Sequence, residues 1–139
     1  MSILLASQMK RRCKSCGDYK DTKEFYRLTS SEDGWHPNCK LCCKVSRALE
    51  AVRRRDKKSK ISVRQYYRAI NLNIPADKTI TLAEVFKRSR GTCSLCHTWV
   101  QPRKASIDHT HPLSLGGHHS WDNVQLVHIR CNLKKGARV

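Results

Sequence analysis

The spacing of the cysteines constrains this chain more than any other feature. Three Cys-x2-Cys pairs begin at Cys13, Cys39 and Cys93, and a His-x2-Cys pair begins at His128. Two residues between ligands let both bind one ion in a tight turn, and two such pairs complete a tetrahedral site. The pairs therefore predict two structural Zn²⁺ sites, with the ligand sets Cys13, Cys16, Cys39 and Cys42, and Cys93, Cys96, His128 and Cys131.

The first zinc site leaves an alternative open. Cys43 directly follows Cys42 and could replace it as the fourth ligand, and His36 is a further possible ligand, although a loop role suits it better. Disulfides are the competing interpretation of the cysteines. The apolar run at residues 3–6 is too short for a signal peptide, so we expect a cytoplasmic protein with reduced thiols.

Composition points to a small, basic protein with a limited core. The chain has 139 residues, 39% of them hydrophobic, and no run of 18 apolar residues that could span a membrane. A chain this small and polar commonly needs metal ions to hold its fold. The formal net charge of +17 and the sequence pI near 10.0 favour a nucleic acid as partner over a membrane surface.

The charge also divides the chain. Residues 1–43 carry a net charge of +3, residues 44–68 one of +8, and residues 69–139 one of +6. We therefore expect an α+β protein with an N-terminal zinc module (1–43), a basic helical connector (44–80) and a C-terminal domain (81–139). In the connector, the residues expected to contact DNA phosphates are Arg53, Arg54, Arg55, Lys57 and Lys58.

Local patterns place the elements. Residues 44–59 lack Gly and Pro and predict a helix, followed by a shorter helix at 61–70 and a loop at 71–78. Thr81 and Glu84 form a capping box that opens a helix ending near Gly91. Residues 106–109 and 124–127 are strand-like, and residues 130–135 predict a helix that ends at Gly136.

The C-terminal part contains a dense series of motifs. In order they are Cys-x2-Cys, Asp108-His109, Pro-Leu-Ser-x-Gly-Gly at 112–117, Asn-x-Gln-Leu from Asn123, His-x2-Cys-Asn from His128, and Lys-Gly at 135–136. Over about residues 81–139 this series resembles the HNH, or ββα-metal, endonucleases, in particular the zinc-stapled kind common in phages. The N-terminal cysteine module resembles the small zinc modules at the front of many phage nucleases.

The resemblance implies a metal-dependent endonuclease that hydrolyses phosphodiester bonds of double-stranded DNA, by nicking or by double-strand cleavage. It implies that Asp108 and Asn132 hold a catalytic Mg²⁺ or Mn²⁺, a role that suits hard oxygen ligands. It also implies that His109 is the general base and that Asn123 fixes its ring through the side-chain amide. Asn132 replaces the family's final His, and His128 replaces a usual zinc-binding Cys.

The sequence also predicts roles for basic residues and histidines of the C-terminal part. Lys134 and Lys135 in the last helix are expected to contact the DNA backbone. His111, His118 and His119 are interpreted as loop or phosphate-facing histidines. The competing hypothesis for the whole chain is a non-catalytic zinc-finger protein that binds DNA or RNA, which would bind plasmid without cutting it in any metal.

Overall fold

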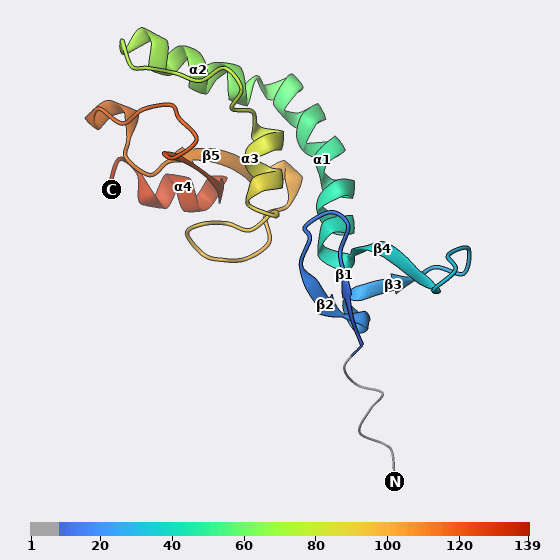
Figure 1. The fold of residues 1–139 in the computed structure, drawn as a ribbon. Coiled ribbons are helices and arrows are strands. Elements are labelled where there is room, and N and C mark those ends of the chain that lie inside the picture. The colour runs from blue at the N-terminus through green and yellow to red at the C-terminus, as the bar shows by residue number, and fades with distance from the viewer. Residues whose placement is uncertain (1–8) are drawn as a thin grey trace. The chain divides into compact units, whose positions relative to one another are not determined.

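The computed structural model describes residues 9–139, and its chain divides into two compact units (Figure 1). The first unit ends at Ser46 and the second begins at Arg47, so the division falls within a continuous helix, α1 (Lys40–Ser59). Helices combine with small antiparallel sheets, which confirms the predicted α+β class. In the described part of the chain, no helix is both long enough and apolar enough to cross a membrane.

The first unit consists of two antiparallel strand pairs around cysteines. β1 (Lys10–Arg12) pairs with β2 (Tyr19–Asp21), and β3 (Phe25–Arg27) pairs with β4 (Trp35–Cys39), with a short 3-10 turn, η1 (Thr22–Glu24), between them. Isolated two-stranded sheets are marginally stable in water. The buried core is one phenyl ring, Phe25, packed with cysteine side chains, so this unit depends on what the thiols bind.

Two basic helices follow each other with one residue between them. α1 begins at Lys40, four residues before the predicted start, and α2 (Ile61–Asn71) matches the second predicted helix. The break is at Lys60, whose φ of 52° is left-handed. Asp56 accepts a 2.8 Å hydrogen bond from the backbone N–H of Ser62, which caps the start of α2.

The next helix, α3 (Leu82–Arg88), begins as its capping signal predicts. The Thr81 hydroxyl oxygen accepts a 3.2 Å hydrogen bond from the Glu84 N–H. Leu82, Val85 and Phe86 are buried, and Phe86 meets the ring of Trp99 edge to face. A Cβ on Gly91 would lie 2.2 Å from that tryptophan ring, so only glycine fits where the chain turns after α3.

The C-terminal part has the order strand, strand, helix. After a 3-10 turn, η2 (Pro102–Lys104), β5 (Ala105–His109) pairs antiparallel with β6 (Val124–His128), and α4 (Ile129–Lys135) follows at once. A loop with a further 3-10 turn, η3 (Leu113–Leu115), joins the strands. α2, α3 and α4 all pack against β5, so the strand that ends in Asp108 and His109 is covered by helices (Figure 1).

Candidate functional site

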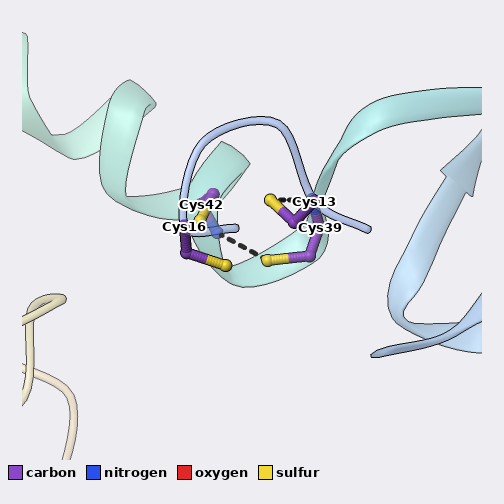
Figure 2. A group of neighbouring side chains, drawn as sticks. All are labelled: Cys13, Cys16, Cys39 and Cys42. Atoms are coloured by element: carbon purple, nitrogen blue, oxygen red, sulfur yellow. Dashed lines mark hydrogen bonds between the residues drawn. The ribbon is translucent and has the colours of Figure 1, made fainter. Parts of the chain in front are cut away.

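The four cysteines of the first unit come together in space. Their sulfur atoms lie within 4.8 Å of one another, with Cys13 and Cys16 in the turn after β1, Cys39 at the end of β4 and Cys42 in the first turn of α1 (Figure 2). This spacing suits four thiolates around one Zn²⁺. Cys43 lies outside the group, because its Sγ faces His36 Nδ1 at 3.5 Å.

Backbone hydrogen bonds favour negative charge on two of these sulfurs. The Cys39 N–H donates to Cys13 Sγ at 3.2 Å, and the Cys42 N–H donates to Cys39 Sγ at 3.5 Å (Figure 2). Burial alone would raise the pKa of the Cys13 thiol, but the backbone N–H groups of Cys16, Cys39 and Ser15 lower it to about 6. Burial raises the pKa of the Cys16 and Cys42 thiols. A thiol that ionises near neutral pH is a ready metal ligand.

The second cluster repeats the same turn with a different residue. Cys93, Cys96, His128 and Cys131 place their ligand atoms within 4.8 Å of one another. In both turns the residue after the second cysteine donates its N–H to the carbonyl of the first, at 2.9 Å. That residue is Gly17 in the first turn and His97 in the second, both with positive φ, so His97 forms the turn and is not a member of the cluster.

His128 presents one ring nitrogen to this cluster and anchors the other. Its Nδ1 lies 3.4 Å from Cys96 Sγ and 3.8 Å from Cys131 Sγ. Its Nε2 lies 3.1 Å from the Trp99 carbonyl oxygen and can donate to it. A ligand histidine whose second nitrogen donates to a carbonyl is held in the right tautomer, so histidine fits this position as well as cysteine would.

A cleft of about 260 Å³ lies beside the strand pair. Asp108 and His109 from β5, Asn132 and Lys135 from α4 and the loop residues 112–114 line it. The sequence predicts one pocket formed by Asp108, His109, Asn123 and Asn132. The fold brings Asp108, His109 and Asn132 to the wall of this cleft, whereas Asn123 does not line it.

Asp108 is held by two donors. Its side chain is buried and accepts a 2.7 Å hydrogen bond from Gln125 Nε2, the residue opposite it on β6. Lys135 Nζ lies 3.1 Å from both carboxylate oxygens and donates to the His109 carbonyl at 2.8 Å. Lys135, assigned to the DNA backbone from the sequence, is instead engaged inside the cleft.

The ring of His109 has a different partner from the one expected. His109 Nε2 lies 2.9 Å from Nδ1 of His119, a residue with no exposed surface. The Asn123 side chain instead accepts from the His111 N–H at 2.7 Å and donates to the carbonyls of His111 and His118. Asn123 therefore ties together the two ends of the loop, and its expected hydrogen bond to His109 is replaced by that of His119.

Sequence reasoning missed His119 for a physical reason. Histidine is common in exposed loops, and His119 follows His109 by ten positions in the sequence. That separation does not by itself indicate that the two side chains are in contact. The loop between β5 and β6 folds back, and Asp77 donates its N–H to the His119 carbonyl at 2.9 Å. His119 also donates its N–H to the Pro75 carbonyl at 3.2 Å, and these tertiary contacts hold its imidazole against His109.

The surroundings of His109 disfavour its charged form. Burial is the largest cause, and the positive charges of His119, Arg68 and Lys135 add to it, against the opposing effect of Asp108. Together they lower the pKa of His109 from 6.5 to about 4. His109 is therefore neutral near pH 7 and can accept a proton.

Some of the remaining candidate residues form hydrogen bonds within the protein, and others are exposed to solvent. Asn132 donates its amide N–H to Ser106 Oγ at 3.3 Å, which leaves its amide oxygen as the possible ligand. Arg55 donates to the carbonyls of Pro102, at 3.3 Å, and Ala105, so it braces the start of β5. The other basic residues assigned to DNA are exposed: Arg53, Arg54, Lys57, Lys58 and Lys134.

Comparison with known proteins agrees with this geometry. The family model of the HNH endonuclease matches residues 93–138, which include the second cysteine cluster, both strands and α4. No curated protein matches the chain. With the order strand, strand, helix and the cleft beside it, residues 93–138 form an HNH domain, which this chain joins to a separate four-cysteine unit.

Proposed function

We propose that this protein is a metal-dependent endonuclease that hydrolyses phosphodiester bonds of double-stranded DNA in the cleft of its HNH domain. The observation that carries the proposal is the placement of Asp108, His109 and Asn132 around one cleft, within the segment that matches the endonuclease family. A carboxylate and an amide oxygen can bind a divalent ion, and a neutral imidazole can accept a proton from water. Metal-dependent hydrolysis of a phosphodiester uses both functions.

The cleft suits a divalent cation. Asp108 offers a carboxylate and Asn132 an amide oxygen, which are hard ligands preferred by Mg²⁺ and Mn²⁺. The Lys135 ammonium lies 3.1 Å from both carboxylate oxygens, so a divalent ion that binds Asp108 would compete with it. When bound, a divalent ion would polarise the phosphate and stabilise the leaving 3′ oxygen.

His109 acts in this proposal as the general base. Its Nε2 is engaged by His119, so its Nδ1 is the nitrogen that takes a proton from the attacking water. This assignment requires His109 Nε2–H to donate to His119 Nδ1, and His119 then carries its own proton on Nε2. His119 thus selects the ring tautomer of His109, the role that the sequence assigned to Asn123.

The exposed basic residues of α1 and α4 bind phosphates of the DNA backbone, and this binding does not depend on base sequence. Arg53, Arg54, Lys57 and Lys58 follow one another along the second half of α1, and Lys134 stands on α4. Phosphate contacts of this kind release counterions and weaken with salt. The thiol-rich clusters favour a reducing compartment such as the cytoplasm, and the likeness to phage enzymes stays a prediction.

The test is cleavage of supercoiled plasmid with Mg²⁺, with Mn²⁺ and with EDTA. We expect nicked circles with either metal and none with EDTA. His109→Ala should abolish cutting while DNA affinity stays within about twofold, because the imidazole acts on water and not on the DNA backbone.

His118→Ala is the matched control, because His118 is an exposed histidine of the neighbouring loop. It should cut at the wild-type rate. A wild-type protein that shifts DNA in a gel yet nicks no plasmid in any metal would support the non-catalytic zinc-finger hypothesis instead.

A further inference from the structure

The cleft extends beyond the segment that matches the HNH family. Gln65 and Arg68 of α2 also line it, although α2 ends more than twenty residues before residue 93. Residues three apart share one face of a helix, and α2 packs against β5, which carries Asp108 and His109. A helix outside the HNH segment therefore contributes to the wall of the catalytic cleft.

Both of these side chains have polar groups without a partner among the described residues. Among the described residues, no carboxylate makes an ion pair with Arg68, and the buried amide oxygen of Gln65 has no hydrogen-bond partner. Other arginines of this unit behave differently: Arg55 and Arg88, for example, donate to backbone carbonyls. Arg68 thus offers an unengaged fork of N–H donors at the cleft.

The other cation in the cleft is already paired. Lys135 is bound to both oxygens of Asp108 and to the His109 carbonyl. Arg68 is close enough to His109 for its charge to act on the ring, where it adds to burial in lowering the imidazole pKa. A phosphate that reaches His109 would consequently meet the guanidinium of Arg68.

We propose that Arg68 is a catalytic residue that binds the scissile phosphate in this cleft, from a helix outside the HNH segment. A guanidinium presents two parallel N–H groups, which match two non-bridging oxygens of a phosphodiester. Negative charge grows on those oxygens as water attacks, so the contact strengthens in the transition state. This inference rests on the proposed nuclease function.

The test compares two arginines of the same helix. Arg64 is exposed, lies one turn before Arg68 and does not line the cleft, so Arg64→Ala removes the same charge at nearly the same place. The measurement is the single-turnover rate of plasmid nicking at saturating protein with Mg²⁺, together with the Kd for the same DNA without metal.

We expect Arg68→Ala to lower the rate about 10²- to 10³-fold, as removal of one transition-state donor does in other enzymes. Arg64→Ala should change the rate less than about twofold, and both variants should weaken binding to a similar small extent. Arg68→Lys keeps the charge without the fork and should recover only part of the rate. Circular dichroism and zinc content should be those of the wild type.

Each other outcome has a definite meaning. If wild-type protein nicks and Arg68→Ala nicks as fast as Arg64→Ala, the inference is wrong while the proposed function stands. If Arg68→Lys nicks as fast as the wild type, only the positive charge at this position matters. That result would overturn the proposed bidentate contact. A wild-type protein that cuts in no metal would overturn the proposed function and this inference with it.

Discussion

His109 and His119 form a buried pair of imidazoles at the end of β5. Their nitrogens lie 2.9 Å apart, and the rings meet at a centroid distance of 5.2 Å. Nε2 of His119 is buried and has no partner among the described residues. Burying this nitrogen without a hydrogen-bond partner costs free energy on folding. Such a cost is typical of functional sites, and it fits a role of His119 in fixing the tautomer of His109.

The first prediction concerns this hydrogen bond. His119→Ala should lower kcat for nicking by about 10- to 100-fold with little change in KM, because a misoriented base still binds DNA. His119→Asn should keep more of the activity, since its amide oxygen can accept from His109 Nε2 as the imidazole nitrogen does. Steady-state nicking kinetics measure both parameters. Equal kcat in His119→Ala and wild type would remove His119 from the mechanism.

The second prediction concerns stability and pH. Burial lowers the pKa of His119 below 6.5 and, with nearby positive charges, that of His109 to about 4. Between pH 6.5 and 4 the unfolded chain binds protons on these groups that the folded chain does not. The free energy of unfolding should therefore fall as pH falls through this window.

Loss of zinc from the proposed sites in acid would also destabilise the protein, so the comparison needs a variant with both cysteine clusters intact. His119→Asn removes one of the two histidines and keeps the zinc ligands. Urea unfolding at pH 7.5 and pH 5.5 should show a smaller decrease in stability in this variant than in the wild type. An identical decrease in both proteins would contradict the prediction.

At the scale of elements, α1 combines two uses of arginine on neighbouring residues. Arg53 and Arg54 are exposed, whereas Arg55 donates to carbonyls at the start of β5. Successive residues of a helix point about 100° apart, so a run of three arginines cannot serve one surface. The run therefore divides between solvent and the packed side of the helix.

The third prediction separates these uses. Arg53→Ala with Arg54→Ala should flatten the slope of log Kd against log salt by up to about 0.9 for each phosphate that the protein no longer binds, with stability nearly unchanged. Arg55→Ala should instead lower the free energy of unfolding by about 1–3 kcal/mol, because two carbonyls are left without a charged donor. Filter binding at several salt concentrations and urea unfolding measure the two effects. An unchanged slope in the double variant would exclude this part of α1 from DNA binding.

At the scale of the whole molecule, two cysteine clusters replace part of the core that a polar chain of 139 residues lacks. Each compact unit contains one cluster, at the point where separate segments of that unit converge. Metal binding at such sites contributes directly to the free energy of folding. The net charge of +17 opposes compaction, because like charges repel one another. Metal binding at the two clusters would therefore matter more for folding.

The fourth prediction is the metal content. Elemental analysis should give about two zinc ions per chain. Cys42→Ser should reduce the content to about one, whereas Cys43→Ser should keep two, since the Cys43 sulfur faces His36 and not the cluster. Cys43 is a matched control because it is the next residue on the same helix. One zinc in the Cys43→Ser protein would contradict the ligand assignment.

Several features of this protein could be predicted from the sequence because their causes are local. Knuckle spacing depends on one tight turn, and both predicted ligand groups assemble in the fold. Helix formers, the Thr81 cap and the glycine at position 136 act within a few residues, so the helices lie close to their predicted bounds. The motif order predicted the domain that the family match bears out.

The tertiary structure alone decided three contacts of the site and the first cluster. Cys42 rather than Cys43 joins the first cluster, because the first turn of α1 directs the Cys42 sulfur to the other cysteines and the Cys43 sulfur to His36. His119 rather than Asn123 meets His109, since the loop between the strands folds back against the residues before α3. The packing of α2 on β5 brings Arg68 to the cleft from outside the motif. These contacts depend on strand register, loop closure and helix packing over long separations, which residue spacing does not encode.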